Sequence, residues 1–175
     1  KPGNFLVLRV NKKGERIPLT IADFDQKYGT ITIIFQEVGY TTKLLGNLKE
    51  GQEIEDIAGP WGNHVETEKY DKIICVGGGT GTALLYPEVK AFSGSNKDVT
   101  TIIGARTKNL VFLEEELREL SDKLYVCTDD GSYGRAGFVT EALAAQLNAG
   151  EHFDLVYAIG PLPMMQAVAD LTRSE

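Results

Sequence analysis

The stretch DKIICVGGGTGTALLYP, Asp71 to Pro87, organises the second half of this chain. It begins with an apolar run of strand type, places four glycines in the five positions from Gly77 to Gly81, and continues as a helical segment to Phe92. Glycine lets a backbone turn tightly and approach a ligand closely, and the start of a helix offers unpaired N–H groups and a partial positive charge. The pattern therefore predicts a strand–loop–helix unit that binds a phosphate group, in preference to a loop whose glycines serve packing alone.

The glycine loop departs from the strict G-x-G-x-x-G fingerprint, because Thr82 and Ala83 follow Gly81. No acidic residue ends the next apolar run, VTTIIG at 99–104, where such a residue would hold an unphosphorylated ribose. Arg106 and Lys108 stand there instead. These cations could admit a 2′-phosphate or could be solvated surface charges, and the sequence leaves both interpretations open.

Further β-then-α units follow the glycine loop. Strands are predicted at 71–76, 99–104, 123–128 and 154–160, and helices at 109–120, 139–150 and 163–171. In the first of these helices leucines 110, 113, 117 and 120 share one face and Asn109 can cap the start, and Gly150 is a C-terminal signal for the second. This alternation predicts a parallel sheet with helices on both faces and ligands beyond the carboxyl ends of its strands. The loops at that edge are 77–81, 105–108, 129–137 and 160–163.

The first half of the chain has a different rhythm. Strand-like segments at 5–10, 16–23 and 30–38, and a turn followed by another strand over 48–59, occur without a long helical pattern. This predicts a small antiparallel barrel or sandwich. We therefore expect two domains, 1–66 and 67–175.

Polar residues in the predicted loops and the rarer side chains give few catalytic candidates. In TDDGSYG, 128–134, Asp129 fits turn and cap chemistry, whereas Asp130 and Gly131 are candidates for ligand contact. The only histidines, 64 and 152, have neither triad nor zinc spacing, and the two cysteines, 75 and 127, lie in apolar runs typical of a core. No metal site is expected within this chain.

Composition excludes some classes of function. The net charge of -7 disfavours a nucleic-acid partner, because the phosphate backbone would repel the protein. No apolar run approaches the length needed to span a membrane, and no signal-peptide pattern is visible. We expect a soluble, cytoplasmic protein that contacts no membrane.

Four short motifs, in order over nearly the whole chain, resemble those of the ferredoxin–NADP⁺ reductase superfamily. RIPLT at 16–20 resembles its R-x-[Y/P]-x-[S/T] flavin motif, and GYTT at 39–42 its G-x-x-[S/T] diphosphate motif. The glycine loop resembles the superfamily's nucleotide loop, and GPLPMM at 160–165 its G-P-x-P-M signature. The resemblance implies an antiparallel FAD-binding β-barrel followed by a Rossmann-like parallel-sheet nucleotide domain.

Within the superfamily, ERIPLTIADFD, GPWGN and TDDGSYGRAGFVTE resemble the small FAD subunits of NADH-dependent ferredoxin:NADP⁺ oxidoreductases, also described as sulfide dehydrogenase subunit beta. That resemblance implies electron transfer between NAD(P)H and an iron-sulfur centre or ferredoxin, through hydride transfer to FAD, in a heteromeric oxidoreductase that can be electron-bifurcating. The electron-transfer subunit of dihydroorotate dehydrogenase is the alternative. A non-catalytic dinucleotide-sensing module and a flavin-free single-domain dehydrogenase are alternatives from other classes.

The resemblance also implies roles for particular residues, with Thr20 near flavin N5 as the catalytic position. The implied FAD contacts are Arg16, Pro18, Leu19, Thr20, Ile34, Phe35, Gln36, Gly39, Thr41 and Thr42. The implied NAD(P) contacts are Gly78, Gly79, Thr80, Gly81, Arg106, Asp130, Gly131, Gly160, Pro161 and Met164. NAD(H) is the expected nucleotide, with NADP(H) as the alternative that Arg106 favours.

The chain departs from the family pattern in three ways. Ile159 stands where the family often has a cysteine before Gly-Pro. The family has a cysteine cluster for a [2Fe-2S] centre after G-P-x-P-M, and no cysteine follows that signature in this sequence. The family's barrel also has a strand before the K-P-G-x-F run, with which this sequence opens. We therefore expect further residues at both ends, a [2Fe-2S] centre in a C-terminal segment outside this sequence, a larger catalytic subunit as partner, and ferredoxin or an iron-sulfur protein as electron partner.

Overall fold

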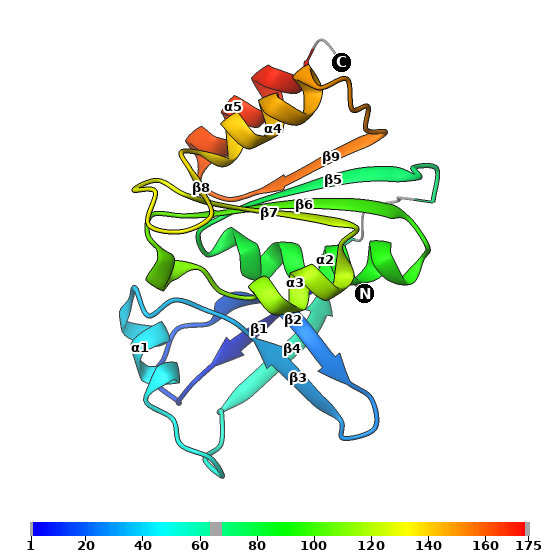
Figure 1. The fold of residues 1–175 in the computed structure, drawn as a ribbon. Coiled ribbons are helices and arrows are strands. Elements are labelled where there is room, and N and C mark those ends of the chain that lie inside the picture. The colour runs from blue at the N-terminus through cyan, green and yellow to red at the C-terminus, as the bar shows by residue number, and fades with distance from the viewer. Residues whose placement is uncertain (1, 64–67, 174–175) are drawn as a thin grey trace. The chain divides into compact units, whose positions relative to one another are not determined.

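The computed structural model describes residues 2–63 and 68–173 (Figure 1). By internal contacts the chain divides into two compact units, Lys1–Val65 and Glu66–Glu175. The predicted domain boundary between residues 66 and 67, and also His64, lie outside the described residues.

The first unit is built on antiparallel pairing. Strands β1 (Phe5–Arg9), β2 (Ile17–Asp25), β3 (Thr30–Ile33) and β4 (Asp56–Trp61) form a sheet in the order β3-β2-β1-β4. The core of the unit forms around Leu6, Leu8 and Val10, which alternate with outward residues along β1 and just beyond it, as a strand half-buried on one face requires. A short helix, α1 (Tyr40–Gly46), lies between β3 and β4 in sequence.

Two predictions for this unit are wrong in detail. The strand expected over 30–38 ends at Ile33, because its ladder to β2 stops at the Ile21–Ile33 pair after a register shift. Residues 34–39 then have no strand to pair with and form no regular element. Helix α1 was not expected, because its seven residues are too few to show a helical period.

The second unit is a five-stranded sheet in the order β8-β7-β6-β5-β9, with every pair parallel. Its strands are β5 (Lys72–Gly78), β6 (Asp98–Ala105), β7 (Lys123–Thr128), β8 (Arg135–Ala136) and β9 (Leu155–Ile159). Helices α2 (Gly81–Gly94) and α3 (Glu114–Leu120) cover one face, and α4 (Val139–Asn148) and α5 (Leu162–Thr172) cover the other (Figure 1). The predicted fold class, an antiparallel β unit followed by a Rossmann-like α/β unit, is confirmed.

The core of the second unit lies on both faces of β5. Ile73 and Cys75 belong to the cluster under α2 and α3, whereas Ile74 and Val76 belong to the cluster under α4 and α5. All four are fully buried, which explains why β5 is apolar at every position from Ile73 to Val76 instead of alternating. Cys127 is also buried, so both cysteines are core residues as predicted.

The helix predicted over 109–120 is wrong at its start. Residues Lys108–Leu110 form a 3₁₀ turn, and α3 begins only at Glu114. Leu113 stands before α3 in the left-handed region, with φ of 59°, and packs with Leu117 in the core. Leu110 is 55% exposed, so the leucine period that predicted a longer helix breaks at its first member.

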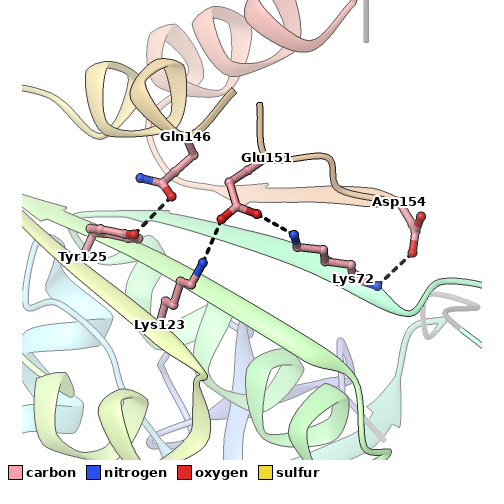
Figure 2. A network of polar contacts seen from close by, with 6 residues as sticks. All are labelled: Lys72, Lys123, Tyr125, Gln146, Glu151 and Asp154. Carbon is pink, nitrogen blue, oxygen red and sulfur yellow. Dashed lines mark hydrogen bonds and ion pairs between the residues drawn. The ribbon is translucent and has the colours of Figure 1, made fainter. Parts of the chain in front are cut away.

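The amino-terminal edge of the parallel sheet is held by a network of polar contacts (Figure 2). The Glu151 carboxylate accepts from Lys72 Nζ at 2.5 Å and from Lys123 Nζ at 2.8 Å, which joins the starts of β5 and β7. The Asp154 carboxylate accepts the backbone N–H groups of Asp71 and Lys72 at 2.9 and 2.8 Å. These contacts fasten the connection after α4 to the sheet at the edge opposite to the carboxyl ends of the strands.

Glu151→Gln is expected to make the free energy of unfolding depend less strongly on pH under acidic conditions. Hydrogen bonds and charge from Lys123 and Lys72 lower the pKa of Glu151 from its ordinary value of 4.5 to about 2. A lowered folded-state pKa contributes stability above the unfolded pKa, and that stability is lost as the pH falls from 4.5 toward 2. The free energy of unfolding, measured with urea at several pH values across this range, should therefore fall less steeply for Glu151→Gln than for wild type. If the free energy of unfolding fell equally steeply with pH in both proteins, the Glu151 ion pairs would not contribute to stability. Glu119→Gln, at an exposed carboxylate of α3, is the control.

No helix within residues 2–63 and 68–173 is both long and apolar enough to cross a membrane.

Candidate functional site

The four loops expected at the carboxyl edge of the parallel sheet do meet there. Gly79 N–H donates to the carbonyl of Gly104 at 2.8 Å, which joins the loop after β5 to the carboxyl end of β6. Asp129 and Asp130 N–H donate to the carbonyls of Ala105 and Arg106 at 3.0 and 3.2 Å, which joins the loops after β6 and β7. The loop after β9 completes the group, since a Cβ added at Gly160 would lie 3.2 Å from Gly78 Cα.

Packing requires glycine at position 81 and disfavours a side chain at position 78, where the flexible Met164 side chain would have to move. A Cβ at Gly81 would collide with the carbonyl oxygen of Ile159, and a Cβ at Gly78 would collide with Met164 Sδ. Met164 therefore packs over Gly78 as part of the core cluster beneath α4 and α5. Gly79 differs, because it has a φ of 54° and no atom within 4 Å of an added Cβ. The loop thus approaches β9 and α5 closely while Gly79 faces open space.

The backbone donors of this loop are suited to an anion. Gly79 N–H is used by Gly104, and the N–H groups of Thr82 and Ala83 donate to loop carbonyls at 3.1 Å. Within the part of the chain that the structure describes, the N–H groups of Thr80 and Gly81 have no acceptor. Two unpaired donors at the start of a 14-residue helix fit the pyrophosphate of a dinucleotide.

Charged residues lie on the neighbouring loops. Arg106 is exposed, and no acceptor for its guanidinium is found in 2–63 or 68–173. Lys108 Nζ lies 5.1 Å from the ring centroid of Tyr133. The Asp130 carboxylate accepts from Ser132 Oγ at 2.6 Å and Ser132 N at 3.0 Å, and these hydrogen bonds hold the pKa of Asp130 below its usual range. The carboxyl edge of the parallel sheet therefore carries an available cation and an ionised carboxylate.

The RIPLT segment places its odd and even residues on different faces of β2. Ile17 and Leu19 pack against the core of the first unit, so the Leu19 side chain is not available to a ligand, and Leu19 pairs with Leu6 in the β1–β2 ladder. Pro18 and Thr20 alternate with them and point to the other face. Arg16 donates to Asp56 Oδ2 at 3.1 Å and keeps 58% of its side chain exposed.

The GYTT segment forms the start of α1. Gly39 N–H donates to Thr42 Oγ1 at 2.9 Å, and the Thr42 hydroxyl donates to the Gly39 carbonyl at 3.0 Å. The Thr42 hydroxyl proton is therefore in use, and Thr41 is buried. The N–H groups of residues 40–42 have no acceptor among the described residues, so the backbone is the better donor to a diphosphate.

The remaining expected flavin contacts lie in the irregular segment after β3. Ile34 and Phe35 are half-buried, and Gln36 is exposed. Because these residues belong to no ladder, their main-chain groups are available to a ligand, except the Gln36 carbonyl, which accepts from Val38 N–H at 2.9 Å. Each expected set lies within its own unit, the flavin set in the first and the nucleotide set in the second.

Sequence reasoning missed three residues that shape these sites. Asp56 accepts from Arg16 and also pairs with Arg9 at 2.5 Å. Because Asp56 lies 40 residues after Arg16, no local sequence pattern indicates this contact. Ser132 and Tyr133 tie the loop after β7 to its neighbours. Ser132 lies two residues after Asp130, a spacing typical of aspartate turns, which could have identified it. No three His, Cys, Asp or Glu side chains gather in a metal-binding arrangement within residues 2–63 and 68–173.

Several known proteins are similar to this chain in sequence. Residues 75–170 match the family model described as oxidoreductase NAD-binding domain. A Thermotoga maritima protein, described as a homologue of the electron transfer subunit of dihydroorotate dehydrogenase B (NAD(+)), is 45% identical over 166 residues, which cover 95% of this chain and 58% of that protein. The electron transfer subunit of the same enzyme from Fusobacterium nucleatum is 35% identical over 97% of this chain and 67% of its own length. The chain thus spans less than two thirds of the Thermotoga relative.

A solved structure is similar to this chain in both sequence and fold. The NADH-dependent reduced ferredoxin-NADP oxidoreductase, determined in a study of flavin-based electron bifurcation, is 43% identical, with a TM-score of 0.90 over 99% of this chain and 62% of that one. A cytochrome P450 reductase from Amycolatopsis superposes with a TM-score of 0.79 at 20% identity, which shows the fold alone.

Proposed function

Because this chain belongs to the oxidoreductase NAD-binding domain family, we propose that it is the flavin- and nucleotide-binding part of an electron-transfer subunit. It passes electrons between NAD(P)H and an iron-sulfur centre or ferredoxin, within a cytoplasmic complex that includes a larger catalytic subunit. The observation that carries the proposal is the pair of unpaired N–H groups at Thr80 and Gly81, in a chain 43% identical to a solved NADH-dependent ferredoxin-NADP oxidoreductase. The names of the relatives favour a second candidate, the electron transfer subunit of dihydroorotate dehydrogenase B.

Residues of the first unit would hold FAD, and the flavin domain would comprise residues 1–66. Arg16 offers its exposed guanidinium to the diphosphate, and the N–H groups at the start of α1 add backbone donors. Pro18 and Thr20 face away from the core and border the isoalloxazine, with the Thr20 hydroxyl near flavin N5. The main chain of Ile34, Phe35 and Gln36 supplies further hydrogen bonds.

Residues of the second unit, 67–175, would hold the nicotinamide nucleotide. The N–H groups of Thr80 and Gly81 bind the pyrophosphate, while Gly78 and Gly79 let the backbone approach it. Asp130, Gly131 and Arg106 contact the adenosine half. Gly160 and Pro161 lie at the nicotinamide end, where Met164 supports the glycine loop from beneath. Bound FAD would supply the hydride-accepting and single-electron chemistry, so the chain itself need supply no acid or base.

NADH is expected to be the better reductant, and the test is the rate at which each nucleotide bleaches the flavin absorbance of the holoprotein. Asp130 is ionised and would oppose a 2′-phosphate, whereas Arg106 would attract one. A higher rate with NADPH would overturn this preference. A colourless protein that binds dinucleotide would instead favour a nucleotide-sensing module.

Thr20→Ala is expected to slow flavin reduction about tenfold or more, a loss equivalent to one hydrogen bond to the reacting ring. Nucleotide affinity should stay unchanged, because Thr20 belongs to the first unit and the nucleotide residues to the second. Stopped-flow reduction of the holoprotein measures the rate, and Thr20→Ser, which keeps the hydroxyl, should restore it. Wild-type rates in Thr20→Ala would remove this residue from the catalytic position.

A further inference from the structure

The loops that follow β6 and β7 are tied together by a short chain of hydrogen bonds. Lys108 N–H donates to Ser132 Oγ at 2.9 Å, and the Ser132 hydroxyl donates to Asp130 Oδ1 at 2.6 Å. Ser132 N–H also donates to Asp130 Oδ1, at 3.0 Å. The Ser132 hydroxyl thus accepts from one loop while it donates within the other, so its hydrogen position is determined by both neighbours.

Tyr133, the next residue, makes a second and independent tie. Its hydroxyl donates to Glu114 Oε1 at 3.0 Å, and the same oxygen accepts from Arg118 at 2.6 Å. The Tyr133 backbone is held at the end of β7, where its N–H donates to Thr128 Oγ1 at 3.0 Å and its carbonyl accepts from that hydroxyl at 2.6 Å. Because Thr128 is fully buried, Tyr133 is a rigid link between β7 and the start of α3.

Lys108 contacts both Ser132 and Tyr133, because its backbone N–H bonds to Ser132 and its ammonium lies over the Tyr133 ring. Lys108 and Tyr133 also line an open cleft of about 590 Å³, together with Glu114, Arg118 and the apolar residues 111–113. Lys108, Tyr133 and Glu114 therefore line one side of this cleft, and the Ser132 tie holds the Lys108 backbone next to it. Arg106 lies two residues before Lys108, and Asp130 and Gly131 directly precede Ser132.

We propose that Ser132 and Tyr133 are positioning residues for the nicotinamide nucleotide, and that their ties form a latch that holds the loops 105–114 and 129–134 in the binding arrangement. The proposal rests on the proposed function of this edge as the nucleotide site. Neither latch residue needs to touch the nucleotide, because each acts through Lys108, Asp130 or Glu114.

The latch acts on binding and not on the reaction itself. Loops that are already ordered lose less conformational freedom when the nucleotide binds, so breaking a tie weakens the affinity. The same contacts are present with bound nucleotide and in the transition state, so the maximal rate of flavin reduction stays unchanged.

The test compares Ser132→Ala and Tyr133→Phe with wild type in the flavin-loaded full-length protein. Calorimetry with NADH should show a dissociation constant roughly fivefold higher for each variant, and reduction at saturating NADH should stay within about twofold of wild type. Ser132→Thr keeps the hydroxyl and should restore the affinity. Ser121→Ala is the matched control, because it removes a hydroxyl bonded at 2.7 Å to Thr101 in the same unit, near the amino-terminal start of β7.

Each outcome separates the latch from the function on which it rests. Unchanged NADH affinity in both variants would overturn the latch, and so would a loss of affinity as large in Ser121→Ala. A wild-type protein that binds NADH but does not reduce its flavin would overturn the proposed function while the affinity comparison still tests the latch. Absence of NADH binding in wild type would overturn both.

Discussion

Gly81→Ala is expected to abolish tight nucleotide binding. The added Cβ would meet the backbone carbonyl of Ile159, which cannot rotate away as a side-chain tip could. The loop must then move from β9, which displaces one of the two unpaired N–H groups proposed to hold the pyrophosphate. We expect at least a tenfold loss of NADH affinity, measured by calorimetry, and a loss of about 1–3 kcal/mol in the free energy of unfolding.

Gly94→Ala is the control for this substitution. Gly94 lies in the same helix, and nothing stands within 4 Å of an added Cβ. Alanine there should raise stability by about 0.5–1 kcal/mol, because glycine is the poorer helix former, and should leave nucleotide affinity unchanged. Wild-type affinity in Gly81→Ala, or an equal loss in Gly94→Ala, would contradict the role of the loop.

Arg16→Ala is expected to weaken FAD binding about tenfold to a hundredfold, since a charge-assisted hydrogen bond contributes about 1.5–3 kcal/mol. Folding should change little, because Asp56 keeps its partner Arg9 at 2.5 Å and Arg16 is 58% exposed. The dissociation constant of FAD, from fluorescence quenching on titration of apoprotein, measures the effect.

Lys12→Ala removes an exposed cation from the turn between β1 and β2 and is the control for Arg16→Ala. It should leave FAD affinity unchanged. If both variants lost affinity equally, the effect would be one of general charge, and the specific contact to the diphosphate would be disproved.

The α/β unit could be predicted from sequence because its signals are local. The run from Ile73 to Val76 is apolar at every position, and only a strand buried on both faces explains such a run in a β-then-α alternation. The predicted strand at 123–128 matches β7, and Gly150 ends the predicted helix with a φ of 83°.

The errors arise where tertiary contacts override local preference. The leucine period from Leu110 to Leu120 predicts one helix, but Leu113 adopts a left-handed backbone and packs into the core, so α3 starts late. Strand β3 is short because its ladder to β2 ends after a register shift, and no local property of 34–38 reveals this. Strand β8 has only two residues, too few for any periodic signal.

In the candidate site, too, the features with local sequence signals could be predicted and those set by tertiary contacts could not. The glycine loop and the following loops could be placed at one edge from topology alone, because the carboxyl ends of parallel strands meet there. The Arg16–Asp56 pair and the Tyr133–Glu114 tie join residues 40 and 19 positions apart, and only the folded chain brings them together. Sequence also could not show that the Thr42 hydroxyl bonds to Gly39 instead of remaining free for a ligand.

The central claim is that a flavin held by this chain takes a hydride from NAD(P)H, and an anaerobic titration of the full-length holoprotein tests it most directly. We predict a yellow protein whose flavin absorbance is bleached as NADH is added, approaching completion between about one and one and a half equivalents per flavin, because a hydride carries two electrons and a [2Fe-2S] centre of the full-length protein would draw one more. A protein that binds NADH but holds no flavin, or a flavin that keeps its absorbance in excess NADH and NADPH, would contradict the account.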